Sequence, residues 1–308
     1  MVPAHHAVSN VKIVASLRAK RSNPASRVGL PRDLRSLAMT ISGVNVMSKR
    51  HQDKSVIVTG AAGAIGFTTS EILCREGAEV MLVDIAADKL EQCVAELQGK
   101  GYKAHGHVAD CADDTAVEAY ARAAYQKFGK IDGFFNNAGI EGALAPTHEY
   151  DIGWFDKVLH VNLRGMFLGL RFVLPYMVAA GSGAVVNTAS IGSERGLAGA
   201  CAYNAAKHGA VGLTRTAASE VAQKGIRVNC VMPGVIETPL LVGMLEQMFD
   251  SVEAGMQKLG EVATLNRVGQ PREVGDVVSF LLSDEASYVN GAKWEIDGGA
   301  LATIRNDI

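Results

Sequence analysis

The chain has 308 residues, of which 48% are hydrophobic and 20% charged, so it is long and apolar enough to bury a large core. Its five cysteines show no paired spacing, which argues against a disulfide framework and favours reduced thiols in a cytoplasmic protein. Residues 51–308 carry 21 basic and 31 acidic residues, and this net charge of −10 argues against nucleic acid as a partner.

Residues 1–50 differ from the rest of the chain. They hold nine Lys or Arg residues against one acid, Asp33, are rich in Arg, Ser and Pro, and show no sustained helical or strand period. One interpretation is a mitochondrial transit peptide, which would direct the protein to mitochondria. The other, which we favour, is a translated upstream region with the true start at Met39 or Met47. On either interpretation we expect residues 1–50 to be disordered and residues 51–308 to form the folded domain.

From Lys54 onward, short β-branched runs alternate with longer helical stretches. The runs are mostly continuous and apolar, as expected for strands covered on both faces. The alternation predicts an α/β fold, with a Rossmann-like doubly wound parallel sheet of about seven strands and helices on both faces, in a single domain. The expected strands are SVIVTG, EVMLVD, AHGHVAD, GFFNNAG, GAVVNTAS, IRVNCVMPG and AKWEID, and the expected helices lie near 64–76, 88–98, 113–128, 154–180, 202–223 and 271–282.

The most apolar stretch of the chain is GMFLGLRFVLPYMVAAG (165–181). Arg171 and Pro175 interrupt it, and no run of eighteen uncharged apolar residues exists. We therefore expect no membrane span and no membrane partner.

The first expected strand leads into VTGAAGAIG (58–66), a glycine turn that opens a helix. Such a turn lets backbone amides approach a pyrophosphate at the helix N-terminus. Asp84 closes the second strand, where a carboxylate can bind both hydroxyls of an adenosine ribose. It would repel a 2′-phosphate, and neither AA at 61–62 nor IA at 85–86 supplies a cation, so we predict NAD rather than NADP. The alternative role for Asp84 is to cap the helix that starts near residue 88.

The segment CAYNAAKHGAVG (201–212) places Tyr203 and Lys207 one helical turn apart on the same face. A snorkelling lysine beside a half-buried tyrosine is the ordinary interpretation. The alternative is acid–base chemistry. A free phenol titrates near pH 10, and a neighbouring ammonium or a bound oxidised nicotinamide favours the phenolate, so the pair could exchange a proton with substrate.

Several motifs follow one another in the order and spacing of the short-chain dehydrogenase/reductase family, which residues 54–300 resemble. They are TGAAGAIG, NNAG, Asn162, Ser190, YNAAK, PGVIETP and IDGG. The resemblance implies an oxidoreductase that interconverts a secondary alcohol and a ketone by hydride transfer. It implies Tyr203 as the general acid/base, Lys207 as the holder of the nicotinamide ribose, Ser190 as a donor to the substrate oxygen, and Asn162 as the support of a water beside Lys207.

The same resemblance implies which residues contact the cofactor. Asp110 and Cys111 would lie at the adenine, and the segment after residue 232 at the carboxamide and pyrophosphate. One departure is Ala64, where the family usually has glycine, and its methyl group narrows the approach to the pyrophosphate unless Gly63 takes that place. The expected cofactor contacts are Gly60, Gly63, Ile65, Gly66, Asp84, Asp110, Cys111, Asn136, Ala138, Gly139, Tyr203, Lys207, Pro233, Gly234, Ile236 and Thr238.

Residues 237–265 occupy the position of the family's substrate lid. Leu241, Leu245, Met248 and Val252 would form one helical stripe, which suits an apolar substrate, core packing or a subunit contact. A cyclic alcohol or a dihydrodiol is the favoured substrate, and the resemblance implies a homotetramer. Glu141 is expected to be a solvated loop acid rather than a group at the substrate mouth. No histidine has ligand partners at metal-binding spacing, so no metal is expected.

Two other functions remain open. The motifs resemble a 3-oxoacyl-[acyl-carrier-protein] reductase almost as well, but such enzymes usually use NADPH and dock an acidic carrier, so Asp84 and the acidic body count against this. The second is a dinucleotide-binding sensor that has lost its chemistry, which would have no need of Asn162, Ser190, Tyr203 and Lys207 together.

Overall fold

The computed structural model describes residues 49–302. Most of the segment predicted to be disordered, residues 1–48, lies outside the described residues, as do residues 303–308. The described residues belong to one compact unit that spans Met47–Ile308.

The centre of the fold is a seven-stranded sheet in which every neighbouring pair is parallel. The strand order is β3-β2-β1-β4-β5-β6-β7, so the predicted doubly wound sheet and all seven predicted strands are confirmed. The strands are β1 (Ser55–Thr59), β2 (Glu79–Asp84), β3 (Ala104–Val108), β4 (Gly133–Asn136), β5 (Gly183–Thr188), β6 (Ile226–Pro233) and β7 (Lys293–Ile296).

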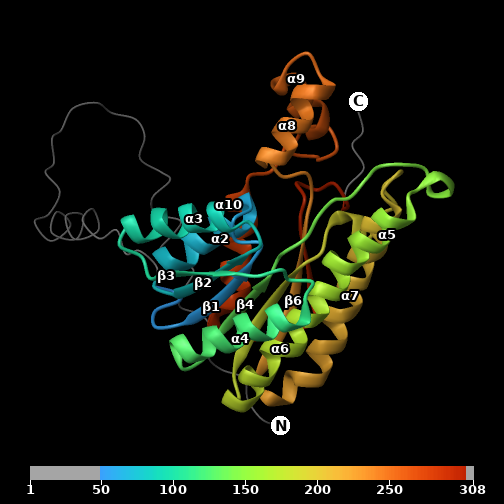
Figure 1. Cartoon of the computed structure of the whole chain (residues 1–308). Helices are drawn as coiled ribbons and strands as arrows, with labels where there is room; N and C mark the ends of the chain where they lie inside the picture. Colours follow the sequence, from blue (N-terminus) through green and yellow to red (C-terminus); the bar gives the residue numbers. More distant parts are fainter. Residues whose placement is uncertain (1–48, 303–308) are drawn as a thin grey trace, which may run out of the picture. The chain divides into compact units, whose positions relative to one another are not determined.

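Helices cover both faces of the sheet (Figure 1). Alternate strand residues supply the two core layers, because successive side chains of a strand point to opposite faces. Val56 and Val58 pack toward α2 (Ala64–Arg75), α3 (Ala87–Gly99) and α10 (Pro271–Leu282). Ile57 packs on the other face, toward α4 (Asp114–Phe128), α6 (Gly165–Ala180) and α7 (Cys201–Val221). This two-sided burial explains why the strand sequences are continuously apolar.

The strand order reverses between β1 and β4, which lie side by side although β2 and β3 lie between them in the chain. The C-terminal ends of all strands share one edge of the sheet, and ligands of this fold bind at such a reversal point. The turn after β1, the end of β2, the end of β4 and the N-terminus of α7 meet there. The topology therefore gathers the predicted site residues from distant parts of the chain.

A continuous helix runs over Ile152–Ala180, formed by α5 (Ile152–Leu159), a π-helical turn η3 (His160–Arg164) and α6. Its length and its mean hydropathy of 1.3 would suit a membrane-crossing helix. However, Leu170, Val173 and Met177 are buried against the sheet, so one side of this helix packs as a core helix does.

The lid predicted at 237–265 contains two short helices, α8 (Pro239–Met248) and α9 (Val252–Gly260). Phe249 has an extended backbone, and the Ser251 hydroxyl accepts a hydrogen bond from the Ala254 amide and caps α9. The single stripe predicted over 241–252 is therefore wrong, because the chain turns before Val252. Leu245 is fully buried against Gly255 of α9, while the side chain of Met248 lies outside the described residues. The remaining short turns are η2 (Thr147–Glu149), η4 (Ile191–Ser193), η5 (Ala222–Lys224) and η6 (Asp284–Ala286).

Candidate active site

A cleft of about 490 Å³ opens at the reversal point of the sheet. It joins the turn after β1 to the N-terminal half of α7, so one cavity connects the predicted dinucleotide site with Tyr203 and Lys207. Its lining residues are Gly60, Ala62, Gly63, Ala64, Ile65, Gly66, Asp84, Ala86, Lys89, Asn137, Gly139, Ile140, Glu141, Thr188, Tyr203, Lys207, Thr238 and Pro239.

Two glycines determine the shape of the turn at one end of the cleft. Gly60 has a φ of +63°, and a side chain there would also meet the Ala138 backbone at 3.0 Å. A Cβ on Gly66 would lie 2.2 Å from the Gly60 carbonyl oxygen. Gly63 is different, because its φ is −77° and a Cβ would come no closer than 3.2 Å to that oxygen. Sterics therefore require glycine at 60 and 66, whereas alanine at 63 would need only a small shift of the Gly60 carbonyl.

Helix α2 begins at this turn with free backbone donors. No side chain caps it, and among the described residues the amides of Ala64, Ile65 and Gly66 have no backbone partner. These amides and the positive end of the helix dipole suit a pyrophosphate. Ala64, the departure from the family pattern, is the first residue of α2 and lines the cleft.

Asp84 at the end of β2 bridges two turns. Its Oδ2 accepts a hydrogen bond from the Ala62 amide at 2.9 Å, and its Oδ1 accepts one from the Ala86 amide at 3.0 Å. Helix α3 starts at Ala87 without a side-chain cap, so the capping role considered for Asp84 is wrong. Lys89 of α3 lines the same end of the cleft. Lys89 was not predicted as a cleft residue, because it is not adjacent in sequence to the glycine turn or to Asp84.

Tyr203 and Lys207 both face the cleft from α7. The Lys207 ammonium donates a hydrogen bond to the Thr188 carbonyl at 2.8 Å and lies 5.5 Å from the centre of the Tyr203 ring. Ser190 follows β5, and its hydroxyl accepts a hydrogen bond from the Gly192 amide at 3.1 Å. The hydroxyl proton of Ser190 is therefore free to be donated to Tyr203 or to a substrate oxygen.

Burial dominates the ionisation of this pair. It raises the pKa of Tyr203, partly offset by the Ser190 hydroxyl, while the negative charge of Glu141 raises it further. Burial also lowers the pKa of Lys207 to about 8. The expected lowering of the Tyr203 pKa by Lys207 is therefore not found: burial outweighs the Ser190 hydrogen bond, and the Lys207 ammonium is directed to Thr188.

Asn162 lies in the π-helical turn η3 and is fully buried. Its Oδ1 accepts from the Ile140 amide, and its Nδ2 donates to the Ile140 carbonyl, both at 2.7 Å. A Cβ placed on Gly139 would touch both Asn162 and the Lys207 ammonium, so the three residues are neighbours. π-Helical turns are frequent at functional sites, and here Asn162 lies within one. It fastens the loop after β4 beside Lys207.

Some predicted cofactor residues do not line the cleft. Asn136 is buried and donates to the Met166 carbonyl at 2.9 Å, whereas Asn137 lines the cleft and donates to the Thr59 carbonyl at 3.1 Å. Asp110 and Cys111 follow β3, where the Asp110 carboxylate accepts from the Ala112 amide at 2.8 Å. The other predicted cofactor residues outside the cleft lining are Ala138, Pro233, Gly234 and Ile236, and the predicted catalytic residues Asn162 and Ser190 lie outside it as well.

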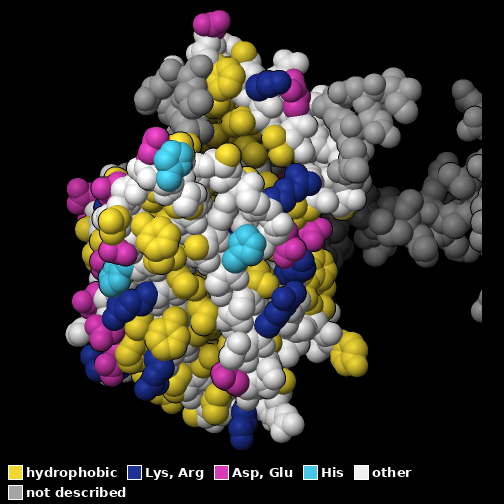
Figure 2. Space-filling model, turned by 90° about the vertical axis from the view of Figure 1, so that its right-hand side faces the viewer, with side chains coloured by type: hydrophobic (Ala, Val, Ile, Leu, Met, Phe, Trp, Pro, Cys, Tyr) yellow, Lys and Arg dark blue, Asp and Glu magenta, His cyan; other side chains and the backbone are white. Residues whose placement is uncertain are grey.

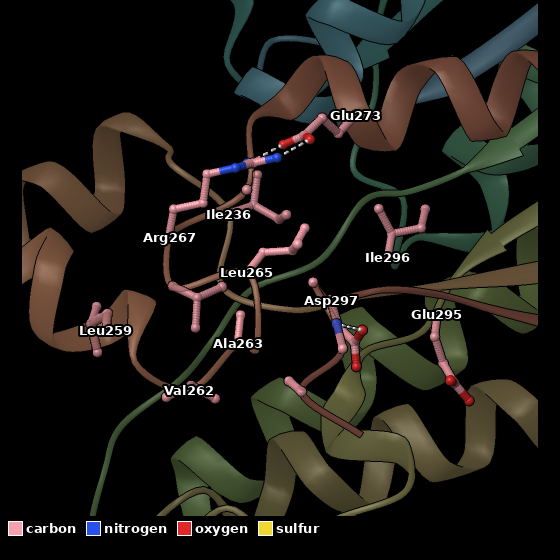
Figure 3. Close-up of a pocket in the computed structure, with 15 residues that line it drawn as sticks. Ile236, Leu259, Val262, Ala263, Leu265, Arg267, Glu273, Glu295, Ile296 and Asp297 are labelled. Carbon is pink, nitrogen blue, oxygen red and sulfur yellow. Dashed lines mark hydrogen bonds and ion pairs between the residues drawn. The ribbon is translucent and has the colours of Figure 1, made fainter. Parts of the chain in front are cut away.

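Ile236 instead contributes to a second cavity, of about 290 Å³, between the end of β7 and the segment that follows α9 (Figure 3). Leu259, Val262 and Leu265 form its apolar side, and the Arg267–Glu273 ion pair closes one end. This cavity contains none of the acid–base residues. Among the described residues there is also no cluster of His, Cys or acidic side chains that could hold a metal ion.

The cleft fits a nicotinamide dinucleotide. The cradle at Gly60 and Gly66, which any side chain would obstruct, lies beside free helix amides that suit the pyrophosphate, and Asp84 offers a carboxylate to the adenosine ribose. Lys207 has two ammonium protons left for the nicotinamide ribose after bonding Thr188. The other end of the same cleft holds the Tyr203 hydroxyl, where an alcohol could be deprotonated.

Comparison with known proteins gives a consistent result. A family model described as enoyl-(acyl carrier protein) reductase matches residues 60–300. Levodione reductase of Leifsonia aquatica is 44% identical over 82% of this chain and 96% of its own length. The crystal structure of levodione reductase has a TM-score of 0.78 and covers 82% of this chain and 99% of its own. Cyclohexanol dehydrogenase of Acinetobacter sp. (strain SE19) is 40% identical over 82% of this chain and 97% of its own.

Similar solved structures hold either cofactor. NAD⁺-bound xylitol dehydrogenase is 33% identical, with a TM-score of 0.76 over 81% of this chain and 99% of its own. A single-residue variant of actinorhodin polyketide ketoreductase, solved with NADPH, is 32% identical, with a TM-score of 0.78 over 83% of this chain and 100% of its own.

Proposed function

Because the chain belongs to the short-chain dehydrogenase/reductase family and is an oxidoreductase that interconverts a secondary alcohol and a ketone, we propose that it uses NAD and acts on a cyclic secondary alcohol. This proposal is supported above all by the cleft that contains Asp84 together with Tyr203 and Lys207. Two relatives, levodione reductase and cyclohexanol dehydrogenase, support the substrate class.

In this proposal three residues act on substrate or cofactor and one positions a loop. Tyr203 accepts the alcohol proton at its phenolic oxygen, and Ser190 donates a hydrogen bond to the substrate oxygen. Lys207, anchored by Thr188, holds the ribose and adds positive charge beside Tyr203. Asn162 positions the loop after β4 next to Lys207. The bound nicotinamide supplies the hydride acceptor.

The preference for NAD rests on Asp84. Its carboxylate is held by the Ala62 and Ala86 amides at the ribose end of the cleft, where it can accept from a 2′-hydroxyl and repel a 2′-phosphate. Lys89 is the only cation lining that end in the described part of the chain. Because Lys89 is exposed and Asp84 is fixed, we expect the carboxylate to dominate.

The test is a substrate screen with the purified protein. Formation of NADH or NADPH would be followed by absorbance with cyclohexanol, cyclopentanol, an open-chain secondary alcohol and xylitol, each with NAD and with NADP, and consumption of NADPH would be followed with a 3-oxoacyl thioester. Oxidation of the cyclic alcohols with NAD at a kcat/KM at least tenfold above the other alcohols is expected. Activity confined to a 3-oxoacyl thioester with NADPH would overturn the proposal in favour of the carrier-protein reductase.

We also propose that the chain assembles as a homotetramer, with the face formed by α5, η3, α6 and α7 as one interface and the C-terminal strand β7 at another. An open groove of about 670 Å³ lies on the helical face, lined by Leu159, Leu163 and Leu213, and Phe167 beside them is 47% exposed. Figure 2 shows hydrophobic side chains gathered on this side of the molecule. Light scattering on a sizing column would give the mass, and Phe167→Asp should reduce it.

A cytoplasmic location is proposed on the basis of the cysteines. All five are free, and Cys74, Cys93 and Cys230 are buried, as expected for a reducing compartment. Cell fractionation together with the intact mass of the native protein would test this, and recovery in mitochondria of a form shortened by a transit peptide would contradict it.

A further inference from the structure

Glu141 lines the catalytic end of the cleft, together with Ile140, Tyr203 and Lys207. It is exposed, and it forms no hydrogen bond or ion pair with any residue that the structure describes. The expectation that it is only a solvated loop acid does not account for this position. An unpartnered carboxylate beside the reacting groups is available to a ligand.

The loop that carries Glu141 is held on both sides. The Ile140 amide and carbonyl both bond the buried Asn162 side chain at 2.7 Å. Further along, the Tyr150 hydroxyl donates to the Ala143 carbonyl at 3.0 Å, and the Ala145 amide donates to the Gly199 carbonyl at 3.0 Å. Glu141 therefore stands on a loop whose backbone is held by Asn162 of η3 on one side and by Tyr150 and Gly199 on the other, which keeps its backbone at the mouth of the cleft.

Among the described residues that line the catalytic end of the cleft, Lys207 is the one basic side chain near Glu141. Asp84 and Lys89 lie at the ribose end of the cleft, and burial raises the pKa of the Tyr150 phenol, so that group carries no charge at pH 7. Lys207 is buried and engaged with Thr188. The charge of Glu141 reaches the reacting group, because it contributes to the raised pKa of Tyr203. A substrate at Tyr203 would feel the same charge.

We propose that Glu141 selects substrates by charge and polarity: it admits neutral cyclic alcohols, accepts a hydrogen bond from a second hydroxyl on the ring, and rejects ring substrates that carry a carboxylate. This rests on the proposed function. A carboxylate accepts hydrogen bonds from hydroxyls and repels anions, so one side chain supplies both the attraction and the exclusion.

The experiment compares wild type with Glu141→Gln and Glu141→Ala. The matched control is Glu149→Gln, which removes the same charge from an exposed acid outside the cleft. For each protein, kcat/KM with NAD is measured on cyclohexanol, cyclohexane-1,4-diol and 4-hydroxycyclohexanecarboxylate. We expect Glu141→Gln to raise the carboxylate-to-cyclohexanol ratio at least tenfold and Glu141→Ala to abolish any preference for the diol, with Glu149→Gln changing neither. An unchanged carboxylate ratio in Glu141→Gln overturns the proposal.

A binding measurement separates this inference from the proposed function. Calorimetric titration of the NAD-saturated proteins with cyclohexanecarboxylate, which cannot be oxidised, should show at least tenfold tighter binding to Glu141→Gln than to wild type. Equal affinity, or no binding to either protein, overturns the role of Glu141. Failure of wild type to oxidise any cyclic alcohol overturns the proposed function instead, and the titration still decides the role of Glu141.

Discussion

The Lys207 ammonium lies 5.5 Å from the centre of the Tyr203 ring and donates its hydrogen bond to the Thr188 carbonyl at the end of β5. The cation is thus tied to the sheet rather than to the phenol. Burial raises the pKa of Tyr203 and lowers that of Lys207 to about 8, so the protein alone keeps the phenol protonated. The positive charge of a bound oxidised nicotinamide would add to that of Lys207 and lower the pKa of Tyr203.

Replacing Tyr203 with phenylalanine removes the proton acceptor and leaves the cleft nearly unchanged in shape. We expect a loss of turnover of about 10²–10⁴-fold, the usual contribution of a positioned acid/base, with NAD affinity within threefold of wild type. Steady-state kinetics and calorimetric NAD titration check both parts. Tyr125→Phe, on the exposed surface of α4, is the control and should retain full activity. Residual activity of more than a tenth in Tyr203→Phe would contradict the assigned role.

The sequence predicted the fold well because burial on both faces leaves a strong local signature. Each expected strand was a short apolar run, and the long stretches between the runs could only return as helices over a parallel sheet. The predicted bounds of the helix at 271–282 agree with α10, and those near 64–76 agree with α2 to within one residue.

Because β4 is buried on both faces, its sequence did not indicate which asparagine at its end faces the cleft. The NNAG motif holds two adjacent asparagines, and no alternation of polar and apolar residues shows which of the two side chains points to the cleft. Asn136 was therefore predicted, although Asn137 lines the cleft. The π-turn at Asn162 has no local sequence signal either, because it lies within a continuous helical pattern. Lys89 was missed because α3 brings it to the cleft through the tertiary fold.

Asp84 and Lys89 oppose each other in the choice of cofactor. Asp84→Ala removes the negative charge that repels a 2′-phosphate and leaves Lys89 to attract it. We therefore expect the kcat/KM ratio of NADP to NAD to rise at least tenfold. The rise should shrink in Asp84→Ala/Lys89→Ala, because the cation is then gone. An unchanged ratio in the single variant would show that Asp84 serves only to join the Ala62 and Ala86 turns.

The two glycines of the phosphate turn should respond differently to alanine. A methyl group at residue 66 would lie 2.2 Å from the Gly60 carbonyl oxygen, so Gly66→Ala must shift the turn. We expect a fall of more than about 5 °C in the melting temperature and loss of measurable NAD binding. In Gly63→Ala the new methyl group would lie 3.2 Å from that oxygen, and the φ of residue 63 is one that alanine adopts readily. We expect the NAD affinity of this variant to stay within threefold of wild type. Differential scanning fluorimetry with and without NAD measures both, and equal behaviour of the two variants would refute the steric account.

His51 should make the stability of the fold depend on pH. It is 1% exposed, its Nε2 lies 3.1 Å from both the hydroxyl and the carbonyl oxygen of Ser279, and the Ser279 hydroxyl donates to Glu76 at 2.5 Å. Burial lowers the pKa of His51 from 6.5 to about 4. The unfolded chain therefore binds a proton near pH 6.5, whereas the folded protein binds it only near pH 4. The free energy of unfolding is therefore highest above pH 6.5 and falls as the pH drops toward 4, by roughly 3 kcal/mol in total. His51→Gln keeps an amide donor for Ser279 but cannot titrate. Urea unfolding at pH 7.5, 6 and 5 should show a shallower loss of stability in His51→Gln than in wild type, and parallel curves would show that His51 is not the titrating group.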